Sequence, residues 1–422
     1  MEKVIKKINN KFYYGWVIVL ISNLTFFMSS PGQTYSISVF VNEYENVFSY
    51  SSTLISSTYS IATILSGALI IFMGRATDKY GARKMIMIAG AMLALSAFFS
   101  SFTSNIVMIF ISFFLLRYFG QGSLTLLPNT LTPKWFEKNR TLAISLSAIG
   151  GLLGALLIPS FNLWLITQLG WENAWRIWSL ILFFIFIPTV YIFAANRPED
   201  HNIPMENQED EDSQSVQSSL TKMNKNSFSL SEALKTKEFW IAGLISMIPA
   251  MFSTGMTFHF FNLMGLRGIN NATAAMIIGL IAVPSFIIPF MAKPIIDKQP
   301  VKRILSTSLI MMILSMVILM LLITNVSQAI MFILFYGLAI AVQNITLNIL
   351  WPNYFGLKYL GSIRGAATIF MVAGSALGPL PFGISFDLTG NYNIAILGMV
   401  IFTSITLILS FFMGTPKKQL VE

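Results

Sequence analysis

The segment GRATDKYGARK, residues 74–84, is a short polar cluster between two long apolar stretches of this 422-residue chain. A second polar cluster, KPIIDKQPVKR, occupies residues 293–303. When the two clusters are aligned, Asp78 lies opposite Asp297, a separation of 219 residues (297 − 78 = 219). The cations that follow keep this separation: Lys79 pairs with Lys298, Arg83 with Lys302, and Lys84 with Arg303. A charged cluster repeated at one separation indicates two related halves.

Two further matches support this duplication. NTLTPKWF, residues 129–136, aligns with NILWPNYF, residues 348–355, again at 219 (348 − 129 = 219). At a separation of 224 (374 − 150 = 224), the aligned pairs are Arg140 with Arg364, Ala143 with Ala367, Gly150 with Gly374, and Gly154 with Gly378. Three matches in the same order predict an internal repeat. Its glycines predict seams where helices pack closely.

Composition places the chain in a membrane. It is 55% hydrophobic and 11% charged, with a mean hydropathy of +0.69, whereas a soluble domain carries about 25% charged residues. The 36 Phe, 13 Tyr and 8 Trp residues suit lipid contact and interfacial belts. The net charge of +9, beside apolar stretches, favours topology signals and anionic lipid over nucleic acid. Without cysteine, disulfides, thiol nucleophiles and thiolate metal sites are excluded.

Apolar runs of about 20 residues, long enough to cross a bilayer, occur twelve times. Their approximate ranges are 14–41, 50–74, 83–103, 105–130, 141–167, 173–195, 238–264, 272–293, 303–324, 327–351, 363–386 and 392–413. Lys and Arg gather before the first span and after the second, fourth and eighth. Cytoplasmic loops carry such an excess. We therefore expect a multi-pass protein of the cell membrane with an uncleaved first helix and both termini in the cytoplasm.

One long polar stretch divides the spans into two groups of six. It contains an acidic run within MENQEDED, residues 205–212, which is typical of a flexible linker. Ser229 and Glu232 predict a capping box that begins a short surface helix. We expect a six-helix bundle at 1–195, a cytoplasmic linker at 196–237 and a second six-helix bundle at 238–422. The predicted fold class is an all-α integral membrane protein with twelve transmembrane helices in two pseudo-symmetric bundles.

The polar cluster after the second span resembles the signature of the major facilitator superfamily, G-x-x-x-D-K/R-x-G-x-R-K. The matching residues are Gly74, Asp78, Lys79, Gly81, Arg83 and Lys84. In that family the aspartate is thought to bridge to the cytoplasmic end of the eleventh helix in one state. The resemblance therefore implies a gating role for this cluster and, in the second copy, for Asp297, Lys302 and Arg303. Lys293 and Pro300 replace the glycines of that copy.

A narrower resemblance is to the bacterial branch that includes monocarboxylate-porter-like and oxalate/formate-exchanger-like proteins. It rests on YYGWVIV (13–19), GQTYSISVF (32–40), RYFGQGSLTLLPNTL (117–131) and GPLPFGISFDLTGNY (378–392). Carriers of that branch place further cations in the eighth and eleventh helices, whereas the corresponding stretches of this chain, residues 272–292 and 365–383, have none. A dicarboxylate substrate is therefore disfavoured, and a monoanion or an uncharged amphipathic solute stays open. The drug/proton antiporter motif G-x-x-x-G-P is incomplete, because Ala155 replaces its proline.

Two ionisable side chains are expected deep in the membrane, where such groups are costly and often functional. Arg117, midway along the fourth span, presents a planar cation suited to a carboxylate; the alternative is a structural arginine bonded to carbonyls. His259, in the seventh span, is either a carrier of a coupling proton or a hydrogen-bonded structural group. Neutral residues that either line the passage or bond helices together are Gln33, Tyr35, Gln121, Asn262, Gln343, Asn344 and Asn348.

These patterns predict a secondary active transporter that works by alternating access. We expect a monocarboxylate-like monoanion moved with a proton or in exchange for a counter-solute, by a monomer surrounded by membrane lipids. The alternatives are an exporter of an uncharged or amphipathic, drug-like solute and a non-transporting membrane sensor. An intramembrane enzyme would need clustered acids or histidines, and the chain has two histidines. No nucleotide-binding loop, cofactor or metal site is predicted, nor is a nucleic-acid partner.

Overall fold

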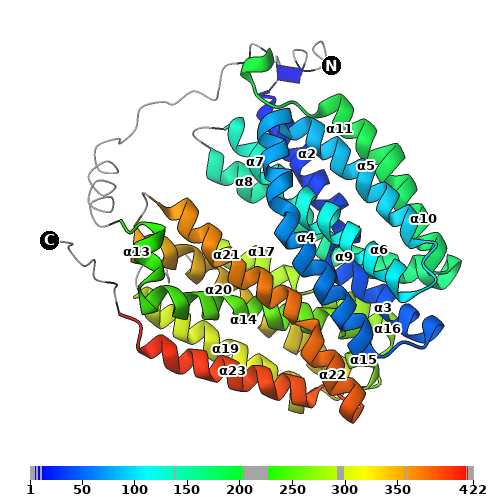
Figure 1. Ribbon diagram of the computed structural model, residues 1–422, viewed down its shortest axis with the longest axis vertical. Helices are drawn as coiled ribbons and strands as arrows, with labels where there is room; N and C mark the ends of the chain where they lie inside the picture. Colours follow the sequence, from blue (N-terminus) through cyan, green and yellow to red (C-terminus); the bar gives the residue numbers. More distant parts are fainter. Residues whose placement is uncertain are drawn as a thin grey trace. The chain divides into compact units, whose positions relative to one another are not determined.

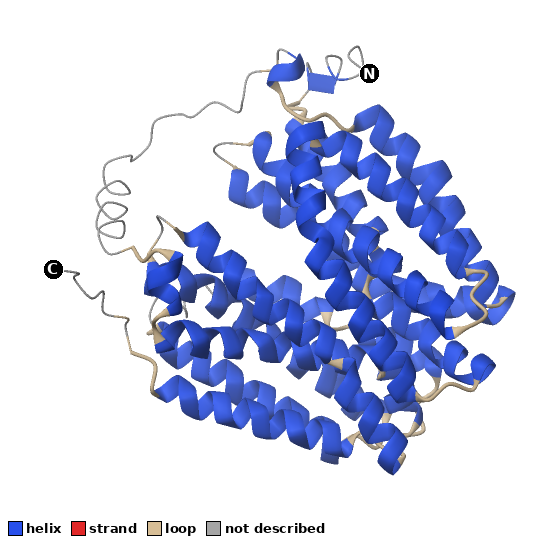
Figure 2. Cartoon of the chain, viewed as in Figure 1, coloured by secondary structure: helices blue, strands red, loops and turns tan. Residues whose placement is uncertain are grey.

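The computed structural model describes residues 5, 8–9, 12–136, 139–201, 203, 227–291, 299–356, 359–414 and 416. Within these ranges all regular structure is helical (Figure 2). Twelve helical stretches of the described chain are long and apolar enough to cross a membrane, which confirms the predicted number of spans. The first is longer than predicted, Gly15–Phe48, and the tenth continues through Pro352 to Phe355.

The helices group into two compact units (Figure 1). The first unit comprises Met1–Glu209, Phe260–Asn262 and Asn271–Gly279. Its helices are α2 (Gly15–Met28), η1 (Ser30–Gly32), α3 (Thr34–Phe48), α4 (Ser52–Tyr80), α5 (Ala82–Ser100), α6 (Ile106–Leu116), η2 (Arg117–Ser123), α7 (Leu124–Leu131), η3 (Thr132–Lys134), α8 (Arg140–Ser147), α9 (Ile149–Leu169), α10 (Trp171–Ile181), η4 (Leu182–Phe186), α11 (Ile187–Phe193), η5 (Glu199–His201) and α16 (Asn271–Gly279).

The second unit comprises Asp210–His259, Leu263–Asn270 and Leu280–Glu422. Its helices are α13 (Leu230–Leu234), α14 (Lys237–Phe258), the C-terminal half of α15 (Phe260–Gly265), α17 (Ala282–Met291), α19 (Val301–Leu321), α20 (Val326–Phe355), α21 (Leu360–Leu377), α22 (Pro379–Thr389) and α23 (Asn393–Phe411). The long helices α19 and α23 pack side by side (Figure 1). The predicted capping box is present at α13, where the Ser229 backbone donates to the Glu232 carboxylate over 2.7 Å.

The repeat seen in the sequence returns as the same helix crossing inside each unit. A Cβ atom added to Gly150 on α9 would lie 1.9 Å from the carbonyl oxygen of Asn23 on α2. A Cβ atom added to Gly374 on α21 would lie 2.5 Å from the carbonyl oxygen of Met247 on α14. The two glycines are 224 residues apart (374 − 150 = 224), and so are their partners Asn23 and Met247 (247 − 23 = 224). Glycine lets the two backbones approach at both crossings.

A buried polar network joins the first, fifth and sixth spans. The Trp178 indole donates to the Asn162 side-chain carbonyl over 2.7 Å. The Asn162 amide in turn donates to the Ser36 hydroxyl over 2.8 Å. Since all three side chains are buried, each bond satisfies a group that would otherwise be costly in lipid. The network fixes how α3, α9 and α10 pack in the first unit.

Two glycines of α21 provide a matched test of the crossing. We expect Gly374→Ala to lower the free energy of unfolding by about 1–3 kcal/mol, because its methyl group overpacks the contact with α14. Gly365→Ala meets no atom within 4 Å and should be neutral or stabilising, since alanine favours helix. Thermal unfolding of the two purified variants in detergent measures the difference. Equal melting temperatures would contradict a close crossing at Gly374.

Candidate functional site

The first span is broken in its middle. Helix α2 ends at Met28, the short helix η1 contains Pro31, and α3 begins only at Thr34. Between them Gln33 has extended backbone (φ −84°, ψ 150°). Proline has no N–H to continue a helical ladder, which accounts for the helix break at Pro31. A break in a membrane span leaves backbone carbonyls that need other partners.

The fourth span is irregular where it meets this break. Between α6 and α7 the chain forms the π-helical segment η2, a local distortion that is frequent at functional sites. A Cβ atom on Gly32 would lie 2.1 Å from the Leu116 carbonyl oxygen, and one on Gly120 would lie 2.7 Å from the Gly32 Cα. Only glycine at both positions permits this approach. The two irregular segments therefore meet backbone to backbone.

Arg117, the first residue of η2, lies buried beside this junction with 2% of its surface exposed. Its Nη1 donates to the Gly32 carbonyl oxygen over 3.4 Å and to the Thr34 hydroxyl over 3.2 Å. The guanidinium carbon lies 5.0 Å from the ring centroid of Tyr59 on α4, which is a cation–π distance. Its Nε–H has no hydrogen-bond partner among the described residues. The cation is thus held in place while one donor stays unused.

Three other predicted residues surround the same junction. Gln33 donates to the Ser29 hydroxyl over 3.0 Å. The Tyr35 hydroxyl lies 3.0 Å from the Ser30 hydroxyl. Gln121 follows Arg117 by four residues on η2, and its side-chain oxygen is buried without a hydrogen-bond partner in the described chain. The first unit therefore gathers Gln33, Tyr35, Arg117 and Gln121 around one helix break, with an unused donor and an unused acceptor.

His259 lies at a second break, in the seventh span, in the other unit. Helix α14 ends at Phe258, so the predicted continuous span 238–264 is interrupted at His259. The ring Nε2 lies 3.1 Å from the Pro379 carbonyl oxygen, which requires Nε2 to carry the proton. Nδ1 lies 3.4 Å from the Tyr392 hydroxyl. His259 is 2% exposed, and it connects α14 to the start of α22 and to the residue before α23.

His259 and Tyr35 are 224 residues apart (259 − 35 = 224), the same separation as Asn23 and Met247 at the matched helix crossing. Pro379 and Tyr392, the partners of His259, were not predicted as site residues, although both lie in the segment GPLPFGISFDLTGNY (378–392). Of the remaining predicted residues, Gln343 is buried and donates to the Ile245 carbonyl over 3.1 Å. Asn262 is half-buried on α15, Asn344 is exposed on α20, and the side chain of Asn348 lies outside the described residues.

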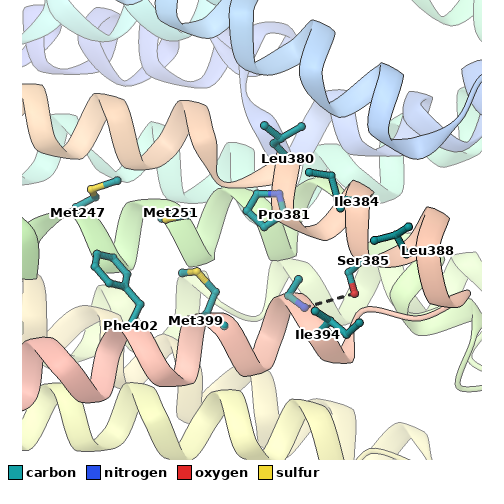
Figure 3. Close-up of a pocket in the computed structure, with 12 residues that line it drawn as sticks. Met247, Met251, Leu380, Pro381, Ile384, Ser385, Leu388, Ile394, Met399 and Phe402 are labelled. Atoms are coloured by element: carbon teal, nitrogen blue, oxygen red, sulfur yellow. Dashed lines mark hydrogen bonds between the residues drawn. The ribbon is translucent and has the colours of Figure 1, made fainter.

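Two apolar pockets lie elsewhere in the units. One, of about 510 Å³, lies between α14, α22 and α23 and includes Met247, Met251 and Met399 (Figure 3). The Ser385 hydroxyl in it accepts from the Ala395 backbone and donates to the Asn391 carbonyl. The other, of about 590 Å³, lies between α2, α8 and α9. Neither is lined by Arg117 or His259, so neither suits a charged solute.

The predicted gating cluster is only partly described. Asp297 lies outside the described residues, as does the side chain of Asp78. Gly74 is half-buried, and Gly81 (φ +84°) makes the turn between α4 and α5. Lys79, Lys84 and Arg303 are exposed, and Arg303 donates to the Gln299 side chain over 3.2 Å. A gating role for this cluster stays a prediction.

Arg83 and Lys302, which are equivalent in the repeat, make equivalent contacts. Arg83 Nη2 donates to the Tyr191 carbonyl oxygen over 2.6 Å, near the end of α11. Lys302 Nζ donates to the Phe411 carbonyl oxygen over 2.7 Å, at the end of α23. Cations stabilise helix C-termini because unpaired carbonyls gather there. Arg83 therefore holds the sixth span, and Lys302 holds the twelfth.

A membrane protein made of two such related units, each with a broken leading span, has the architecture of a two-bundle transporter. The sequence pattern of the Major Facilitator Superfamily matches residues 16–379, and the chain belongs to this superfamily. Its members are transporters rather than enzymes, as predicted. The fold agrees with the nucleoside transporter NupG (14% identity, TM-score 0.70, covering 94% of this chain and 98% of that one). It also agrees with a bacterial homologue of the human lysosomal transporter Spinster (14%, 0.70, 94% and 96%).

Curated relatives share part of the chain. Monocarboxylate transporter 9 of Gallus gallus is 27% identical over 160 residues, 38% of this chain and 31% of the relative. Monocarboxylate transporter 2 of Rattus norvegicus is 24% identical over 191 residues, 44% and 37%. The riboflavin transporter RibJ of Trypanosoma cruzi (strain CL Brener) is 27% identical over 166 residues, 38% and 35%. The match spans about a third of each relative's length.

Substituting Arg83 and Lys84 separately distinguishes the anchoring of α11 from an effect of surface charge. We expect Arg83→Gln to lower the free energy of unfolding by about 1–2 kcal/mol, because the Tyr191 carbonyl loses a charged donor. Lys84→Gln removes the same charge from an exposed side chain and should change stability by less than about 0.5 kcal/mol. Thermal unfolding of both variants checks this. If the Lys84 variant were the less stable, the anchoring role of Arg83 would be wrong.

Proposed function

We propose that this transporter moves a small organic monoanion of the monocarboxylate type by alternating access, with proton coupling or in exchange for a counter-solute. The observation that carries the proposal is Arg117, a buried cation with an unused Nε–H at the junction of two irregular segments. Neither predicted span at the junction, 14–41 nor 105–130, contains an Asp or Glu. A carboxylate substrate would supply the missing negative charge.

The hydrogen bonds of Arg117 to Gly32 and Thr34 go to neutral groups. At 3.4 and 3.2 Å they are longer than the 2.7–2.9 Å typical of a guanidinium with a carboxylate. A monocarboxylate bound at the guanidinium would form shorter, charge-assisted bonds. The hydroxyl oxygens of Tyr59 and Thr34 lie 2.8 Å apart, and these two side chains would keep the guanidinium oriented.

The partial relatives support the same substrate class. Two of them are named monocarboxylate transporters, and we extend that substrate class to this chain as part of the proposal. An uncharged solute is the second candidate, since Arg117 already has neutral partners and one relative is named a riboflavin transporter. The two candidates differ in whether transport needs the charge of Arg117.

Substitution of Arg117 tests the proposal. In proteoliposomes with an internal pH dye, we expect pyruvate or lactate to cause proton movement, and Arg117→Gln to slow it by at least about tenfold because a charged hydrogen bond is lost. Pyruvate counterflow gives the same comparison if the coupling is exchange. Arg117→Lys keeps the charge but not the planar fork, so its rate should be intermediate.

Arg176→Gln is the matched control, because Arg176 contacts Asn173 and Ser101 rather than the junction. It should transport like the wild-type protein. Thermal unfolding of each variant separates loss of function from loss of fold. Undiminished transport by a folded Arg117→Gln variant would exclude the monoanion mechanism and favour the uncharged solute.

We further propose that His259 acts through its hydrogen bonds to the start of α22 and to the residue before α23. Glutamine offers a donor and an acceptor, so His259→Gln should retain most of the transport rate, whereas His259→Phe should lose it. Both rates are measured in the same proteoliposomes, with and without a proton gradient. If His259→Gln instead abolished proton movement while exchange continued, the ring would be a proton carrier.

A further inference from the structure

The turn between α4 and α5 carries two lysines that converge on one exposed aromatic ring. Lys79 Nζ lies 5.2 Å from the ring centroid of Tyr80, and Lys84 Nζ lies 5.4 Å from it. All three side chains are exposed, Tyr80 by 51%. The neighbouring Arg83 differs, because its guanidinium donates to the backbone of α11. Two like charges therefore contact one exposed ring.

Each lysine stands at the end of an exposed apolar stripe on its own helix. On α4, Phe72 precedes Lys79 by seven residues, about two turns, and is 55% exposed. On α5, Ile88 follows Lys84 by four residues, and Leu95 follows Ile88 by seven. Both are exposed, Leu95 by 57%. Residues at these spacings share one helix face, so two apolar stripes start at the two ammonium groups.

The charge of the turn matches an anionic partner. Arg75, Lys79, Arg83 and Lys84 carry four positive charges against the single negative charge of Asp78, a net charge of +3 (4 − 1 = 3). Both helices are membrane spans that pack against each other, so the turn lies where the apolar spans end. At that depth an exposed tyrosine and lysines meet the headgroups of the bilayer.

We propose that Lys79, Tyr80 and Lys84 form a binding site for the headgroup of an anionic glycerophospholipid. The phosphate binds the ammonium groups and offsets their positive charge. The Tyr80 hydroxyl, at the boundary of the apolar region, donates to the phosphate or glycerol oxygens. The two acyl chains follow the stripes headed by Phe72 on α4 and by Ile88 on α5. This site is separate from the substrate junction at Arg117 and does not depend on which solute is transported.

Native mass spectrometry of delipidated protein in detergent tests the site. Phosphatidylglycerol and phosphatidylcholine with identical acyl chains are added at equal concentration, and the lipid-bound fractions are compared. We expect the wild-type protein to retain phosphatidylglycerol preferentially. The Lys79→Gln, Lys84→Gln double variant should lower its apparent affinity by about tenfold, as expected for two lysines at an anionic surface. Binding of phosphatidylcholine should not change.

Charge-matched variants exclude a general electrostatic effect. Lys235→Gln with Lys237→Gln removes two exposed lysines at the start of α14 and should bind phosphatidylglycerol like the wild-type protein. Tyr80→Phe keeps the ring and Tyr80→Ala removes it, so affinity should fall further in Tyr80→Ala. Equal losses in the two lysine double variants, or none in either, would overturn the proposal. So would full displacement of the lipid by an equal concentration of glycerol 3-phosphate, which would indicate a site for soluble phosphates.

Discussion

The close approach of Gly32 and Gly120 is the contact on which the candidate site depends. Because neither residue has a side chain, the break of the first span meets the π-helical segment of the fourth backbone to backbone. The break leaves the Gly32 carbonyl available to Arg117, and the π segment starts at that arginine. A charged side chain is tolerated at this depth because backbone and hydroxyl groups hold it.

The internal repeat explains why both units have a similar plan. Gly150 and Gly374 make the same crossing, Tyr35 and His259 both lie at helix breaks, and Arg83 and Lys302 bond to the sixth and twelfth spans. The chemistry differs between the copies. The first unit holds a permanent cation beside its break, whereas the second holds an imidazole bonded to Pro379 and Tyr392. The two related units therefore carry different side-chain chemistry at their breaks.

Local patterns predicted the fold well because hydropathy and capping act over short distances. The twelve spans and the capping box at Ser229 both follow from neighbouring residues. The depth of Arg117 was predictable for the same reason. Its contact with Gly32 joins residues 85 positions apart, and that of Arg83 with Tyr191 spans 108. Such partners depend on tertiary packing, which no local pattern encodes.

The most direct measurement is calorimetric titration of pyruvate into purified wild-type protein and into Gly120→Ala. This variant keeps Arg117, but its methyl group would lie 2.7 Å from the Gly32 Cα. We predict at least about tenfold weaker binding, since misplacing a charged hydrogen bond costs more than 1 kcal/mol. Gly151→Ala, whose nearest contact is 4.0 Å away, should bind like the wild-type protein. Unchanged pyruvate affinity in a folded Gly120→Ala variant would show that the junction does not position Arg117 for an anion.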